Sequence, residues 1–171
     1  MTATDLGTAP VPSFDDEDEG GRKLVLICSK GSLDMAYPAL VLANAALGEG
    51  IEVHIFFTFW GFEIINKKTM GDLKFVAMGN PATHMPNAVM GLPGMTAVAT
   101  RMMRKQIAEL DVPEVPEFLD IIHESGGHLW ACRMSADMNR LTEGDLYDGV
   151  EGIISATDFM ELSQGAQIIF I

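Results

Sequence analysis

Short apolar runs alternate with helical segments along most of the chain, and this alternation limits the fold more than any other feature. The runs over residues 23–28, 51–57 and 128–131 are apolar almost throughout, as in strands that are covered on both faces. Turn residues and segments of helical periodicity separate them. The sequence therefore predicts an α/β fold, with a mostly parallel sheet of about five strands and helices on both of its faces.

The elements expected from periodicity and turn residues fill the chain from residue 22 onward. A length of 171 residues and an apolar content of 48 % suit one domain with a substantial core. The last helix is expected to begin at a cap formed by Ser155 or Thr157. The expected strands span 23–28, 51–57, 128–131, 150–154 and 167–171, and the expected helices span 33–48, 61–67, 96–110, 116–125, 133–140 and 156–163.

The charge of the chain is strongly acidic, and part of it is local. Residues 1–21 contain six acidic side chains and no basic one, which predicts a disordered acidic tail ahead of a domain over residues 22–171. The net charge of −13 argues against nucleic acid as a partner. The sequence has no signal peptide and no apolar run long enough for stable membrane insertion, so we expect a cytoplasmic protein.

Both cysteines lie at the ends of expected strands. Cys28 closes the run 23–28, and Cys132 follows the run 128–131 at the point where a helix is expected to begin. In a parallel sheet the carboxyl ends of the strands gather at one edge, and a thiol beside a helix N-terminus favours its thiolate form. The alternative for each cysteine is a role as a small buried apolar residue. Its position makes Cys132 the candidate nucleophile.

Residues near the two cysteines are candidates for binding a substrate. Arg133 directly follows Cys132 and is expected to lower its pKa or to attract an anionic sulfur species, and Lys30 is placed to hold a small anion. If the first strand and the strand 128–131 are neighbours, Cys28 and Cys132 open onto one shared pocket. The aromatic residues after the second strand either line that pocket or seal the core. The candidate binding residues are Ser29, Lys30, Gly31, Thr58, Trp60, Arg133, Met134 and Ser135.

Other chemistries are weakly supported by the sequence. It contains no Gly-x-Gly-x-x-Gly or Walker pattern for phosphate and no Gly-x-Ser-x-Gly for a serine nucleophile. His128 begins the strand that leads to Cys132, which places it at the far end of that strand from the thiol, and neither cysteine has metal-site spacing. We therefore expect neither a metal nor a cofactor. The methionine-rich segment 85–103 is expected to form a subunit interface.

Four segments of the chain resemble DsrE/DsrF-like proteins, and most closely the DsrE2-type branch, which is often labelled peroxiredoxin-like. They are Cys-Ser-Lys-Gly-Ser-Leu-Asp (28–34), Phe-Phe-Thr-Phe-Trp-Gly (56–61), Ala-Cys-Arg-Met-Ser-Ala-Asp-Met (131–138) and Asp-Gly-Val-Glu-Gly (148–152). The resemblance covers about residues 22–171. It implies a flavodoxin-like three-layer α/β/α fold, a homo-oligomer, and a cysteine at position 132 that carries sulfur in relay with rhodanese-like and TusA-like proteins.

Residues and resemblance together indicate a carrier-type sulfurtransferase. In this interpretation Cys132 holds sulfane sulfur as a persulfide or thiosulfonate, and Cys28 resolves or shares it. The oligomer would be a trimer, tetramer or hexamer. Two alternatives stay open: a non-catalytic oligomeric scaffold, and a thiol redox or peroxidase-like protein.

Overall fold

A computed structural model describes residues 21–76 and 92–171, and within them five parallel strands form one sheet. The strands are β1 (Lys23–Cys28), β2 (Glu52–Phe57), β3 (His128–Cys132), β4 (Val150–Ile154) and β5 (Gln167–Phe170). Their order is β4-β3-β2-β1-β5, and every neighbouring pair is parallel. The first four strands thus follow one another across the sheet, and β5 returns to the free side of β1.

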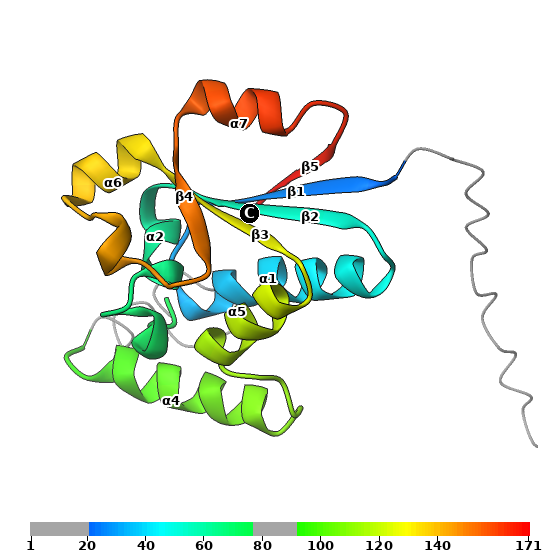
Figure 1. The fold of residues 1–171 in the computed structure, drawn as a ribbon. Coiled ribbons are helices and arrows are strands. Elements are labelled where there is room, and N and C mark those ends of the chain that lie inside the picture. Colours follow the sequence, from blue (N-terminus) through cyan, green and yellow to red (C-terminus); the bar gives the residue numbers. More distant parts are fainter. Residues whose placement is uncertain (1–20, 77–91) are drawn as a thin grey trace, which may run out of the picture.

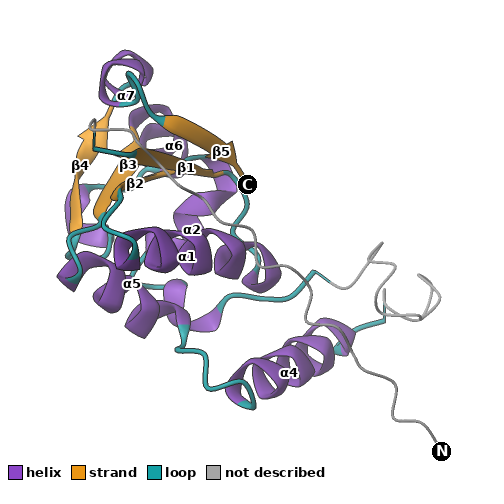
Figure 2. Ribbon diagram, turned by 90° about the vertical axis from the view of Figure 1, so that its right-hand side faces the viewer, coloured by secondary structure: helices purple, strands orange, loops and turns teal. Residues whose placement is uncertain are grey.

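Helices cover both faces of this sheet. Helices α1 (Leu33–Gly48) and α5 (Val115–Glu124) lie on one face, and α7 (Ala156–Leu162) lies over the other (Figures 1 and 2). This is the predicted three-layer α/β sandwich. The remaining elements are η1 (Phe59–Gly61), α2 (Phe62–Ile65), η2 (Met70–Asp72), α4 (Met95–Ala108), α6 (Arg133–Asn139) and η4 (Glu143–Asp145).

Small residues on α1 allow it to lie close to the sheet. Its buried positions recur every three or four residues, as expected for the inner face of a helix, and four of the six are alanine. The buried α1 residues are Leu33, Ala36, Ala39, Leu40, Ala43 and Ala46.

At the other end of the chain, Ser155 caps α7 in a capping box with Asp158, which confirms one of the two predicted caps.

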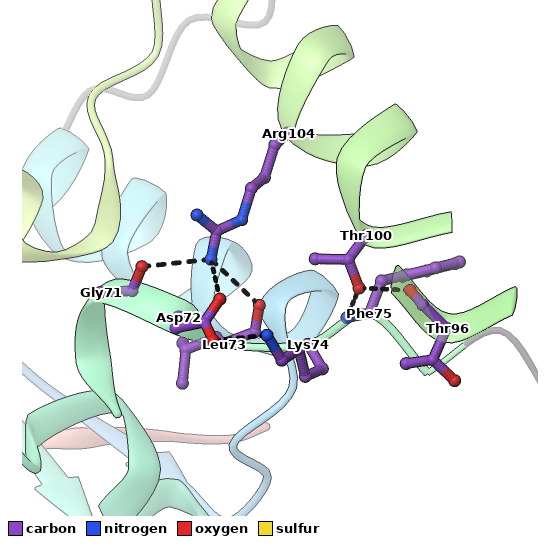
Figure 3. A network of polar contacts seen from close by, with 8 residues as sticks. All are labelled: Gly71, Asp72, Leu73, Lys74, Phe75, Thr96, Thr100 and Arg104. Atoms are coloured by element: carbon purple, nitrogen blue, oxygen red, sulfur yellow. Dashed lines mark hydrogen bonds and ion pairs between the residues drawn. The ribbon is translucent and has the colours of Figure 1, made fainter. Parts of the chain in front are cut away.

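Polar contacts join helix α4 to the segment 71–75 (Figure 3). The guanidinium of Arg104 donates to the carbonyl oxygen of Gly71 at 3.1 Å and pairs with the carboxylate of Asp72 at 3.3 Å. The hydroxyl oxygen of Thr100 accepts from the N–H of Phe75 at 3.0 Å. Thr100 is the one buried residue of this helix. Met103 and Ile107 also pack against the core, whereas Val98 and Met102 are exposed.

Each element that the sequence predicted lies in the described residues, with ends shifted by at most a few positions. The acidic tail lies almost wholly outside the described residues. Residues 85–91 of the methionine-rich segment 85–103 also lie outside them. Across residues 21–76 and 92–171, none of the helices combines the length and the apolar character that crossing a membrane requires.

The turn after β2 packs directly onto the end of β1. A Cβ atom at Gly61 would lie 2.1 Å from the carbonyl oxygen of Cys28, and one at Gly31 would lie 2.1 Å from the carbonyl oxygen of Trp60. The N–H of Thr58 donates to the same Cys28 carbonyl at 2.9 Å. Both glycines are therefore required by close backbone contacts rather than by an unusual backbone angle.

We predict that Gly61→Ala destabilises the protein by roughly 1–3 kcal/mol, because the added methyl group must displace the backbone at the end of β1. Gly48→Ala is the matched control. Gly48 is the last residue of α1 and has no atom within 4 Å of a built Cβ, so this change should be neutral or slightly stabilising. Urea denaturation measures both, and equal midpoints for the two variants would contradict the prediction.

Candidate functional site

Cys132 lies at the point where β3 ends and α6 begins. Its side chain is 7 % exposed, and its nearest polar neighbours come from two elements. Thr58 follows β2, the strand next to β3, and Ser135 belongs to the first turn of α6; both are buried. The two hydroxyl oxygens are 3.3 Å apart. The site therefore combines one thiol with two hydroxyl groups at the carboxyl edge of the sheet.

The hydroxyl of Ser135 is oriented by the backbone of Phe59. The N–H of Phe59 donates to Ser135 Oγ at 2.7 Å, so the hydroxyl hydrogen is free to point toward the thiol or toward Thr58. Phe59 has a φ of 47°, in the left-handed region that is unfavourable for a bulky side chain. Phe59 is not among the candidate residues predicted from the sequence, because its contribution comes from a backbone angle that no side-chain motif reveals.

Hydrogen bonding lowers the pKa of Cys132 by more than burial raises it. Burial alone would raise this pKa. The N–H of Ser135, the hydroxyls of Thr58 and Ser135 and the N–H of Met134 act in the opposite direction, and together they hold the pKa below its ordinary value of 9.0. Donors of this kind lower the pKa because they stabilise the negative charge of the thiolate. Since α6 has only seven residues, local donors rather than a long helix dipole favour the anion.

Cys28 has the opposite chemistry. It is 1 % exposed, and burial raises the pKa of its thiol to about 12. Cys28 of β1 is in register with Phe57 of β2. On the other side of β2, Trp130 of β3 is in register with Phe56, and Cys132 lies two residues beyond Trp130. Side chains alternate between faces along a strand, and Phe56 stacks on Phe159 of α7. Cys132 therefore points to the α7 face of the sheet and Cys28 to the α1 face.

The strand order excludes the shared pocket for Cys28 and Cys132, which the sequence predicts only if β1 and β3 are neighbours. Strand β2 lies between β1 and β3, so the two cysteines are two strand spacings apart, about 10 Å. A disulfide requires Cα atoms within about 7 Å of each other. Separation and opposite orientation together exclude direct sulfur exchange between Cys28 and Cys132 within one folded chain.

Two other candidate residues are engaged away from the thiol. The hydroxyl of Ser29 donates to the carbonyl oxygen of Ile171 at 2.9 Å, at the end of the chain. The guanidinium of Arg133 donates to the carbonyl oxygen of Ile153 on β4 at 2.7 Å and has no part in lowering the pKa of Cys132. Met134, in contrast, supplies its N–H to the site and keeps its side chain exposed.

A separate hollow of about 560 Å³ lies at the carboxyl edge of the sheet, and the remaining candidates line it: Lys30, Gly31 and Trp60. Trp60 is 62 % exposed and lies two residues beyond Thr58. The candidate residues thus divide into a thiol site and an adjacent hollow, joined by the short segment 58–60.

His54 and His128 lie away from the thiol. His128 starts β3 and so lies at the opposite end of that strand from Cys132, as the sequence predicted. Its ring stacks on that of His54 with centroids 4.6 Å apart, and each ring contacts a glutamate, Glu151 and Glu52 respectively. Within the described residues, no three His, Cys, Asp or Glu side chains gather in a way that would hold a metal ion.

A sequence profile of the DsrE/DsrF/DrsH-like family matches residues 21–171, which include every element described above. The chain belongs to this family. Its resemblance to the sulfur carrier protein DsrE2 of Allochromatium vinosum amounts to 34 % identity over 155 residues, covering 86 % of this chain and 96 % of that protein. The uncharacterized protein YrkE of Bacillus subtilis is 27 % identical over 161 residues, covering 90 % of this chain and 99 % of its own.

Solved structures support the fold of this DsrE-family chain. The protein of unknown function MTH1491 from Methanobacterium thermoautotrophicum superposes with a TM-score of 0.56 at 10 % identity, covering 88 % of this chain and 99 % of its own. The ychN protein from E. coli superposes with a TM-score of 0.50 at 14 % identity, with the same coverage. At such low identity these similarities establish the fold alone.

We predict that Ser135→Ala raises the pKa of Cys132, because the thiolate loses a donor while burial is unchanged. At neutral pH the rate of alkylation by iodoacetamide should fall by about tenfold, the value of one hydrogen bond to an anion. The rate measured against pH should reach half its maximum below 9.0 in the wild type and at a higher pH in the variant.

Ser163→Ala serves as the control, since Ser163 is also buried but its hydroxyl donates to the carbonyl oxygen of Met160. An unchanged pH profile in Ser135→Ala would show that the hydroxyl does not stabilise the thiolate.

Proposed function

We propose that this DsrE-family protein is a cysteine-based sulfur carrier, that is, a carrier-type sulfurtransferase. The thiolate of Cys132 attacks a sulfane sulfur of a donor, the donor's bond to that sulfur breaks, and the leaving group departs with the electron pair. Cys132 is left as a persulfide or, with a sulfonate-bearing donor, as a thiosulfonate. The observation that carries this proposal is the set of hydrogen-bond donors that lowers the pKa of a largely buried thiol.

Relatives support the same role. The protein from Allochromatium vinosum that is 34 % identical to this chain is named a sulfur carrier. Sulfur-transfer proteins of the TusA-like and rhodanese-like kinds are the partners we propose, in a cytoplasm that keeps both cysteines reduced. The exposed side chains of Phe59, Trp60 and Met134 surround the thiol site with apolar surface on which such a partner can dock.

The arrangement of the two thiols favours this role over disulfide redox chemistry. A redox protein that forms an internal disulfide needs a second thiol within reach, and Cys28 lies about two strand spacings away on the opposite face. In the proposed mechanism Cys28 is therefore a core residue and takes no part in transfer.

We predict that Cys132→Ser abolishes sulfur loading and that Cys28→Ser leaves it intact. The first change removes the nucleophile, and the second removes a thiol whose pKa of about 12 keeps it protonated. Intact mass after incubation with polysulfide or tetrathionate measures the adduct, and a thiol reductant should reverse it. Undiminished loading of Cys132→Ser would overturn the proposal. The absence of any adduct on the wild type would favour the scaffold alternative.

We also propose that the protein forms a homo-oligomer through the segment 85–103. The part of this segment in the described residues includes the start of α4, where Val98 is 51 % exposed and Met102, one turn further on, is 61 % exposed. Apolar side chains at this spacing form one stripe on the helix surface. A second copy that covers this stripe would bury it, since both side chains face away from the core.

Replacing Val98 and Met102 with lysine should convert the oligomer to a smaller species, because the stripe then carries two added charges. Light scattering measures the mass in solution. Met160→Lys is the control, since Met160 is equally exposed but lies on α7, on the opposite side of the sheet (Figure 1). A mass unchanged by the double replacement would place the interface elsewhere.

A further inference from the structure

A second polar cluster lies on the same face of the sheet as the thiol, at the other end of β3. His54 of β2 and His128 of β3 are in register, and their rings stack with centroids 4.6 Å apart. Trp130 and Cys132 follow His128 at alternate positions of β3, so all three side chains leave the strand on the α7 face. Along β3, Trp130 therefore lies between the histidine pair and the thiol.

The hydrogen bonds of His54 fix its protonation state. The indole Nε1 of Trp130 donates to His54 Nδ1 at 3.1 Å, and an indole N–H can only donate. Nδ1 is therefore unprotonated, so the ring is neutral and its Nε2–H donates to the carboxylate of Glu52 at 2.7 Å. The bond to Trp130 exists only in this neutral form, because a proton on Nδ1 would place two N–H donors against each other.

The surroundings of His54 favour the neutral ring. The residue is 6 % exposed, and burial is the largest effect that lowers the pKa of its imidazole from the ordinary value of 6.5. His128 and Lys23 act in the same direction, whereas Glu52 raises this pKa. The proton is therefore taken up as the pH falls below 6.5. The charged and imidazole side chains of the elements around His54 are Lys23 on β1, Glu52 on β2, His128 on β3, Glu151 on β4, and Asp158 and Glu161 on α7.

The bond to His54 also turns the indole of Trp130 away from the thiol. His54 is in register with His128, which lies on the far side of Trp130 from Cys132. The indole N–H therefore points back toward the start of β3. Neighbours on the same face of a strand are only about 7 Å apart, so an indole released from His54 can turn toward the end of β3 and cover Cys132.

We propose that His54 is a proton sensor that controls access to Cys132. In its neutral form, Nδ1 holds the indole of Trp130 and keeps it turned away from the thiol. A proton from solvent converts Nδ1 from an acceptor to a donor, the hydrogen bond to Trp130 breaks, and the released indole covers the thiol. The inference rests on the proposed carrier function for its consequence, which is that acidification slows sulfur loading.

The fluorescence of Trp130 tests the sensor directly. Trp60→Phe leaves Trp130 as the one tryptophan of the chain, and a protonated imidazole quenches a neighbouring indole. The emission should therefore fall on acidification with a midpoint below pH 6.5. His54→Asn is the matched variant, because its amide oxygen replaces Nδ1 as the acceptor and takes up no proton. The transition should be lost in this variant, and its persistence there, or its absence from the parent chain, would overturn the inference.

Access to Cys132 is measured in the Cys28→Ser background with 4,4′-dithiodipyridine, which also reacts at acid pH. At each pH, the rate with His54 present is divided by the rate in His54→Asn, which removes the ionisation of the thiol that is common to both. This ratio should be constant at alkaline pH and fall to about half of that value at the fluorescence midpoint, where half of the sensors are protonated. A ratio that does not change with pH would overturn the control of access.

His128→Gln is the control, because His128 stacks on His54 but its own Nδ1 contacts Glu151 and not Trp130. Both transitions should persist in this variant, with a midpoint shifted upward because an opposing charge is lost. Loss of both transitions would assign the sensor to His128 and overturn the inference. Polysulfide loading of Cys132 at alkaline pH, measured by intact mass, reports the carrier function separately. A failure to load refutes the carrier alone, and an invariant rate ratio refutes the sensor alone.

Discussion

The contact between the turn after β2 and the end of β1 is the constraint on which both the thiol site and the adjacent hollow depend. Gly61 lies against the carbonyl of Cys28, and Gly31 lies against the carbonyl of Trp60, so two loops from neighbouring strands are fixed with no side chain between them. This contact determines where Thr58 meets the thiol and where Trp60 meets the hollow. Between them, Phe59 adopts a left-handed backbone angle and directs its N–H to Ser135. The backbone, rather than any single catalytic side chain, arranges the edge of the sheet.

The two cysteines show that burial does not by itself decide the reactivity of a thiol. Both are almost fully covered, and both end a parallel strand. Cys28 is surrounded by core residues, and desolvation raises its pKa to about 12. At Cys132, four hydrogen-bond donors from Thr58, Met134 and Ser135 more than offset the same effect. Fixed donors at a largely buried position thus favour the thiolate form of Cys132.

The sequence was sufficient for the elements and for the layer arrangement, because apolar runs, helical periodicity and turn residues are local signals. It also located Cys132 at a strand end. Strand order is not a local property, so the separation of Cys28 from Cys132 became evident only in the folded chain. The hydrogen bond of Arg133 is likewise not a local property. Arg133 follows Cys132 in the sequence, but its guanidinium donates to the carbonyl oxygen of Ile153 on β4. Thr58 and Ser135 were recognised as candidates, but the role of Phe59 depends on a backbone angle that the sequence does not encode in a recognisable pattern.

The placement of the two thiols on opposite faces of the sheet has a consequence for turnover. The chain has two cysteines, and the second lies out of reach of the first. A sulfur adduct of the kind proposed for Cys132 therefore has no second thiol of its own chain within reach, and its transfer depends on a thiol from another molecule. Under the proposed function, the rate of unloading would then depend on the concentration of the acceptor thiol.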